Sequence, residues 1–236
     1  MGAARGSVEV VDDPAGEIAL RLAAAANAGA QIALTGGSTP RIAYERAAEL
    51  GADWSSAKIW WGDDRCVGPD HEQSNYGMAK AALLDRIEGE PPRIHRIEGE
   101  LGPGPAAHQY EEALRGAFPG ARVPELDLIL LGLGPDAHCA SLFPRNPELG
   151  EQERWAVGVN SPGMAPLVPR VTLTLPVLNA ARNVVFLVTG ADKAPAVRRA
   201  FAGPPDPDAP ASLIDPVDGS LTLILDAAAA EGLQAA

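Results

Sequence analysis

The chain has 236 residues, of which 46% are hydrophobic and 21% charged, a composition typical of a globular protein and not of a disordered or fibrous one. Its formal net charge of −12 argues against nucleic acid and acidic membrane surfaces as partners, because both are bound through clustered Lys and Arg. No stretch reaches the length of an apolar membrane span, and the two cysteines, Cys66 and Cys139, lie too far apart to indicate a disulfide framework. We therefore expect one cytoplasmic domain over residues 1–236, as a monomer or a weak dimer.

Strand-like and helix-like segments alternate along the chain. The strand-like runs are residues 7–11, 31–35, 57–61, 93–99, 126–131, 155–159, 170–175, 183–189 and 219–225. The helix-like runs are residues 12–29, 40–50, 75–87, 104–118 and 191–203. Asp13 and Pro14 suit the N-cap and the first turn of the first helix. The alternation predicts an α/β fold with a largely parallel sheet flanked by helices.

The run "LDLILL", residues 126–131, is the most strand-like segment. It is continuously apolar after its Asp, as a central parallel strand buried on both faces would be. In such sheets ligands bind at the carboxyl ends of the strands. Polar loops that follow apolar strands are therefore the candidates for a site, and they are "GGSTP", "GDDR", "GLGPDAH" and "GADK".

The loop "LTGGSTP" joins a strand to a helix and could form an anion cradle. Gly36 and Gly37 allow close approach of the backbone, Thr39 could cap the helix, and Pro40 fits its first position. Exposed amides at a helix N-terminus attract anions. The alternative is a tight turn without a ligand. The loop lacks the Lys of a P-loop and the third Gly of a dinucleotide fingerprint, so it indicates neither ATP nor NAD.

The loop "WWGDDRCVGPDHEQSN" places Asp63, Asp64 and Arg65 at a strand end. A carboxylate beside an arginine stays ionised, which suits a proton acceptor or a ligand of sugar hydroxyls. The alternative is a solvated, salt-bridged loop. His71, in the same loop, is interpreted as an exposed residue.

The loop "GLGPDAH" carries the sharpest candidates, Asp136 and His138. A carboxylate two residues away can orient the imidazole, which can take a proton from water and return it to a leaving group. The alternative is a histidine that only caps the next helix. Ser141 is interpreted as a helix-start residue and not as a nucleophile, because it lacks the G-x-S-x-G elbow. Cys139 lacks a suitable approach to His138 for a nucleophile pair, and His95 and His108 are interpreted as structural or surface residues. The scattered histidines and lone cysteines provide no metal cage.

Five segments in order, "LTGGSTP", "WWGDDRCVGPDHEQSN", "DLILLGLGPDAHCASLFP", "VPRVTLTLPVLNAARNVVFLVTGADKAPAVRRAF" and "APASLIDPVDGSLTLILD", resemble the 6-phosphogluconolactonase family. The resemblance covers nearly the whole chain. It implies a Rossmann-like fold shared with glucosamine-6-phosphate deaminases and ribose-5-phosphate isomerases. The implied activity is hydrolysis of 6-phospho-D-glucono-1,5-lactone in the pentose phosphate pathway, with a sugar phosphate as the partner and without cofactor or metal.

The resemblance also assigns roles by position. His138 matches the catalytic histidine, and Asp63 and Arg65 match the Asp-Glu-Arg loop of the family. The residues expected to hold the phosphate are Gly36, Gly37, Ser38, Arg170 and Lys193. Independently of the resemblance, we expect Arg65 or nearby amides to stabilise the oxyanion of the reaction.

Two residues depart from the family pattern. Ala137 replaces a glycine; if this position requires a positive φ, the alanine costs roughly 1 kcal/mol or shifts His138. Asp64 replaces a glutamate.

The related deaminases carry a glutamate where this chain has Phe143, so the lactonase is favoured over the deaminase. A non-catalytic sugar-phosphate sensor is the other alternative, and it would need a partner module for which one domain leaves little room.

Overall fold

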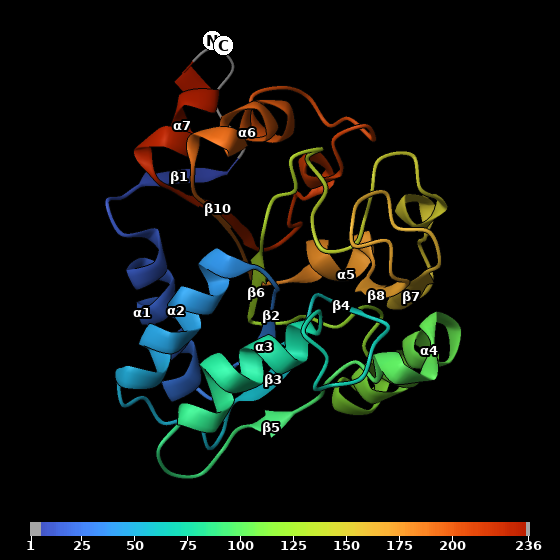
Figure 1. The fold of residues 1–236 in the computed structure, drawn as a ribbon. Helices are drawn as coiled ribbons and strands as arrows, with labels where there is room; N and C mark the ends of the chain where they lie inside the picture. Colours follow the sequence, from blue (N-terminus) through green and yellow to red (C-terminus); the bar gives the residue numbers. More distant parts are fainter. Residues whose placement is uncertain (1–5, 235–236) are drawn as a thin grey trace.

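The computed structural model describes residues 6–234 and contains a seven-stranded parallel sheet (Figure 1). Its order is β1-β10-β9-β6-β2-β3-β5. The strands are β1 (Ser7–Val10), β2 (Gln31–Leu34), β3 (Lys58–Trp61), β5 (Arg93–Ile94), β6 (Leu128–Leu131), β9 (Asn183–Val188) and β10 (Ser220–Leu225). All residues of β6 are buried, and it lies in the middle of the sheet. The predicted central strand and largely parallel sheet are confirmed.

Helices flank the sheet. The α-helices are α1 (Pro14–Asn27), α2 (Ser38–Glu49), α3 (Asn75–Ala82), α4 (Pro103–Ala117), α5 (Leu175–Ala180), α6 (Ala194–Phe201) and α7 (Ala227–Gln234). In Figure 1, α1 runs beside α2 and α6 beside α7, and each pair is in contact. Asp13 caps α1 as predicted, since its side chain accepts a hydrogen bond from the Gly16 N–H at 3.2 Å. Within residues 6–234, no helix is long and apolar enough to cross a bilayer.

A second, antiparallel sheet of three strands lies beside the main one. Its order is β4 (Asp63–Arg65), β8 (Arg170–Leu173) and β7 (Ala156–Val159). Gly62 joins the two sheets, because its N–H donates to Leu34 of β2 at 2.9 Å and its carbonyl accepts from Leu173 of β8 at 2.8 Å. The polar residues that follow β3 are thereby carried directly from one sheet into the other.

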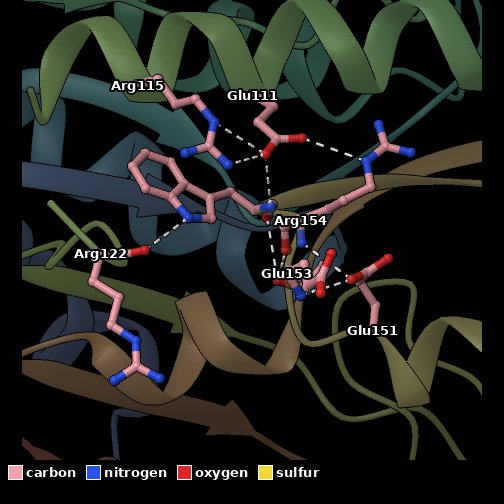
Figure 2. Close-up of polar contacts among 8 residues, drawn as sticks. Glu111, Arg115, Arg122, Glu151, Glu153 and Arg154 are labelled. Atoms are coloured by element: carbon pink, nitrogen blue, oxygen red, sulfur yellow. Dashed lines mark hydrogen bonds and ion pairs between the residues drawn. The ribbon is translucent and has the colours of Figure 1, made fainter. Parts of the chain in front are cut away.

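Helix α4 is fastened to the small sheet by one buried carboxylate (Figure 2). Glu111 accepts hydrogen bonds from Arg115 Nη2 at 2.6 Å, from Arg154 Nε at 3.4 Å and from the Trp155 N–H at 3.3 Å. The Arg115 guanidinium also lies 4.2 Å from the centre of the Trp155 ring. These contacts join α4 to the segment that enters β7, so the small sheet is supported on its outer side.

Several predicted elements differ in the structure. Residues 63–65, expected in a loop, form β4 because β8 supplies them with a ladder partner. The predicted strand 93–99 shortens to Arg93–Ile94. The next residue, His95, stacks its ring on that of Trp60. Helix α2 begins at Ser38, and Thr39 does not cap it, since its hydroxyl lies 3.1 Å from that of Thr189. Helices α5 and α7 were not predicted from the sequence.

Candidate active site

A cavity of about 270 Å³ opens at the carboxyl ends of β2, β3, β6 and β9. The loops after these strands meet there because the strands are neighbours in the sheet. Most of the predicted site residues line the cavity, namely Gly36, Gly37, Asp63, Arg65, His138, Arg170 and Lys193. Two of the predicted site residues do not line the cavity. Ser38 is exposed at the start of α2, and Asp136 contacts His138, which does line it.

His138 and Asp136 form a close pair. The Nδ1 atom of His138 lies 2.5 Å from Asp136 Oδ1, and the same oxygen accepts from the His138 N–H at 3.2 Å. Burial raises the pKa of Asp136, but the hydrogen bonds from His138 outweigh it and hold that pKa below its ordinary value. Because the ionised carboxylate accepts from Nδ1, Nε2 is left as the basic nitrogen of the neutral ring. The predicted orienting role of Asp136 fits this geometry.

Gly134 makes room for this pair, and the sequence reasoning missed it. Its N–H donates to the His138 carbonyl at 2.9 Å, and its own carbonyl accepts from the Ala137 N–H at 2.9 Å. A Cβ on Gly134 would collide with His138 Nδ1 and would lie 2.8 Å from Asp136 Oδ1. The spacing "GLG" before the Asp was the available signal, because close approach of a side chain requires glycine.

Ala137 adopts the left-handed conformation that the family's glycine would favour, with a φ of 66°. The conformation costs an alanine roughly 1–2 kcal/mol. Its carbonyl accepts from the Ala211 N–H at 2.9 Å, and its methyl group is fully buried, which hold the backbone in place. The predicted strain is therefore present, whereas the His138–Asp136 contact is intact.

Phe143 packs against the histidine from the side. The centre of its ring lies 4.5 Å from that of His138. The guanidinium carbon of Arg170 lies over the face of the Phe143 ring, 5.2 Å from its centre.

Residues 139–142 form a turn closed by a bridge between Cys139 and Leu142, and no helix begins at Ser141. The interpretations of Ser141 as a helix start and of His138 as a helix cap are thus wrong.

Three cationic side chains line the same cavity, and each donates hydrogen bonds to backbone carbonyls of the protein. Arg65 Nη1 donates to the Gln73 carbonyl at 2.7 Å, and Lys193 Nζ donates to the Leu133 carbonyl at 3.0 Å. Arg170 Nη2 donates to two carbonyls of the loop that precedes β8, each at 3.2 Å. Burial lowers the pKa of Arg170 from its ordinary value, with Asp63 opposing the effect.

Arg65 and Arg170 lie opposite each other in the ladder between β4 and β8. The Nε atoms of both are buried and, among the described residues, have no acceptor. Two like charges held side by side by the backbone favour an anion between or beside them. A phosphate, which accepts several hydrogen bonds, fits this arrangement.

Asp63 and Asp64 are both buried, so the alternative of a solvated loop is wrong. Asp63 accepts from Ser141 Oγ at 2.6 Å and faces the cavity, whereas Asp64 faces away from it. Asp64 accepts from the N–H groups of Arg65, Asn75 and Tyr76 at 2.7, 2.7 and 2.9 Å and so caps the start of α3. The contact left in doubt by the shorter side chain of Asp64 is thus a contact to the backbone.

Asn75 is another residue of the cavity that sequence reasoning missed. Its Nδ2 donates to the Asp63 carbonyl at 2.9 Å, and a Cβ on Gly36 would collide with its Oδ1. Gly36 is therefore needed for the approach of Asn75, besides any contact it makes with an anion. The motif "SN" at the end of the polar loop carried too little information to single Asn75 out.

The carboxyl group of Asp64 predicts a specific dependence of stability on pH. Burial raises its pKa from 3.8 to about 6, against the opposing hydrogen bonds. A pKa raised in the folded state gives stability that is present below about pH 4 and is lost as the pH rises to about 6, a change of roughly 3 kcal/mol. In urea unfolding, the stability of the wild type relative to Asp64→Asn should fall by this amount between pH 4 and pH 7. Asp70→Asn, in an exposed part of the same loop, is the control, and a constant difference for Asp64→Asn would contradict the expectation.

Comparison with known proteins places the chain in a family. A family model described as glucosamine-6-phosphate isomerases/6-phosphogluconolactonase matches residues 7–223. The chain belongs to this family. It is 43% identical over 202 residues to the 6-phosphogluconolactonase of Nostoc sp., covering 84% of this chain and 82% of that protein. It is 39% identical over 212 residues to the 6-phosphogluconolactonase of Homo sapiens, with coverage of 88% and 82%.

Solved structures of the family show the same fold. The 6-phosphogluconolactonase of Trypanosoma brucei matches with a TM-score of 0.82 and 28% identity, over 98% of this chain and 100% of that chain. A monomeric glucosamine-6-phosphate deaminase matches with a TM-score of 0.79 but 18% identity, over 95% of this chain and 99% of that chain. The second likeness concerns the fold alone.

Proposed function

We propose that this protein hydrolyses 6-phospho-D-glucono-1,5-lactone to 6-phospho-D-gluconate in the pentose phosphate pathway. One observation carries the proposal: the His138–Asp136 pair, at 2.5 Å, opens on the cavity that Arg65, Arg170 and Lys193 also line. A general base and a cluster of cations at one site suit a substrate with a hydrolysable ester and a phosphate. The names of the relatives support the same reaction.

In the proposed mechanism, Arg170 and Lys193 hold the phosphate and so fix the position of the lactone ring. His138 Nε2 removes a proton from a water molecule as the water oxygen attacks the lactone carbonyl carbon, while Asp136 stabilises the resulting imidazolium. The tetrahedral intermediate then collapses, the bond from C1 to the ring oxygen breaks, and His138 returns its proton to that oxygen. Arg65 or nearby backbone N–H groups stabilise the oxyanion.

We also propose that residues 1–236 form one functional unit. The main sheet contributes His138 and Lys193 through its loops, and the small sheet contributes Arg65 and Arg170, so neither sheet holds the site alone. A sugar phosphate is the proposed partner. A cytoplasmic location is consistent with Cys66 and Cys139, which are both free thiols.

A deaminase reaction is the alternative within the family, and Phe143 argues against it. The phenyl ring lies against His138 where the deaminase pattern has a glutamate, and a phenyl ring cannot transfer a proton. The test measures both reactions with purified protein: lactone hydrolysis coupled to oxidation of 6-phosphogluconate, and ammonia release from glucosamine 6-phosphate. No hydrolysis above the spontaneous rate would overturn the lactonase proposal.

Lys193 is expected to act mainly in binding of the phosphate. Lys193→Gln removes one charged hydrogen-bond donor, which is typically worth about 1.5–3 kcal/mol, so KM should rise by about tenfold or more. Steady-state kinetics with the phosphorylated lactone and with glucono-1,5-lactone separate the effects, because the loss should be small without the phosphate. Lys80→Gln, on the exposed face of α3, is the control. An equal loss on both lactones would assign Lys193 to the support of the loop at Leu133 instead.

A further inference from the structure

Ser141 is a buried residue that the proposed mechanism does not use. It follows His138 by three positions and is completely inaccessible to solvent. Its N–H donates to Thr172 Oγ1 at 3.2 Å, and its hydroxyl donates to Asp63 Oδ2 at 2.6 Å. Both of its hydrogen-bond donors therefore bind the small sheet, whereas the chain before it comes from the central strand of the main sheet.

The two residues that Ser141 binds are direct partners in the small sheet. Asp63 of β4 pairs with Thr172 of β8, and two residues along the same strands Arg65 pairs with Arg170. Side chains two positions apart on a strand lie on the same face. Ser141 thus attaches to the cross-strand pair next to the arginines, on the face that carries them.

The segment that carries the base, from Ala137 to Ser141, is conformationally strained. Ala137 and Ala140, on either side of His138 and Cys139, have φ values of 66° and 48°. Two alanines in the left-handed region each cost roughly 1–2 kcal/mol, so the surrounding contacts must hold the loop in this form. The Ala211 N–H holds Ala137 on one side, and Asp63 and Thr172 hold Ser141 on the other.

We propose that Ser141 is a positioning residue for the lactonase reaction. Its hydroxyl, through Asp63, fixes the distance between the imidazole of His138 and the two arginines of the small sheet, Arg65 and Arg170. The inference rests on the proposed function. Displacement of a base by about 1 Å from its productive position can cost a hundredfold in rate, so a single buried hydrogen bond between the two parts of the site has a large effect.

The test measures kcat and product binding separately. Ser141→Ala should lower kcat by tenfold to a hundredfold and leave the inhibition constant of 6-phosphogluconate within threefold, since the arginines and Lys193 remain in place. In the Asp63→Ala background the same change should alter kcat by less than twofold, because the partner through which Ser141 acts is already absent. Ser141→Cys keeps a side chain of similar shape but is a weaker hydrogen-bond donor, so it should lower kcat as Ser141→Ala does. It replaces Ser141→Ala in the test if that variant does not fold.

The control is Thr222→Val, which removes a buried hydroxyl from β10, away from the cavity. Its melting temperature should be similar to that of Ser141→Ala, but its kcat should equal that of the wild type. A kcat for Ser141→Ala within twofold of the wild type would overturn the proposal, as would an equal loss of kcat in the Asp63→Ala background. These outcomes are distinct from failure of the proposed function, in which the wild type itself would show no hydrolysis above the spontaneous rate.

Discussion

Replacement of His138 by glutamine is expected to lower kcat for lactone hydrolysis by about a thousandfold, within the 10²–10⁴-fold range of general acid–base catalysis. Glutamine retains a polar side chain of similar size but cannot accept a proton from water at neutral pH. The Asp136 carboxylate then has no imidazolium to stabilise. The measurement is hydrolysis by the purified variant after subtraction of the spontaneous rate, together with its melting temperature.

The control for this variant is His108→Gln. His108 lies on the outer face of α4, where its side chain is 71% exposed and near Glu112, so its loss should affect neither rate nor fold. Binding of 6-phosphogluconate should be nearly unchanged in His138→Gln, because the cationic side chains are untouched. A folded His138→Gln enzyme with close to the wild-type rate would remove His138 from the mechanism.

The sequence predicted most of the main sheet and of the cavity because both depend on local patterns. Continuous apolar runs identified strands such as β6, and polar loops after those runs identified His138 and Lys193 at one edge. Asp13 at the start of α1 was likewise predictable from residue types alone. These features require only the neighbours in the chain.

The features that the sequence did not predict depend on distant partners. Residues 63–65 become a strand only because β8, more than a hundred residues later, pairs with them. Asn75 enters the cavity because Gly36 has no side chain, and Ser141 turns from an expected helix start into the anchor of a loop because Asp63 accepts its hydroxyl. Two strands of the small sheet, β7 and β8, were predicted, but their antiparallel pairing and the addition of β4 were not, and with them the opposed position of the two arginines was missed.

Gly134→Ala is expected to have the second large effect, and it tests the geometry of the base directly. Gly134 does not have a positive φ, so alanine is compatible with its backbone. The added methyl group would instead collide with His138 Nδ1 and crowd Asp136 Oδ1. The imidazole must therefore leave its contact with the carboxylate, and kcat should fall by about a hundredfold, the effect of a displacement of about 1 Å.

Because the collision involves only the catalytic pair, the loss should appear in kcat and not in product binding. Gly116→Ala is the matched control, since a Cβ at this position of α4 would meet open space, and it should leave the rate unchanged while slightly favouring the helix. The two variants are compared by steady-state kinetics and thermal unfolding. A Gly134→Ala enzyme with normal kcat would show that His138 acts without its close contact to Asp136, and the role of Asp136 in orienting the base would have to be withdrawn.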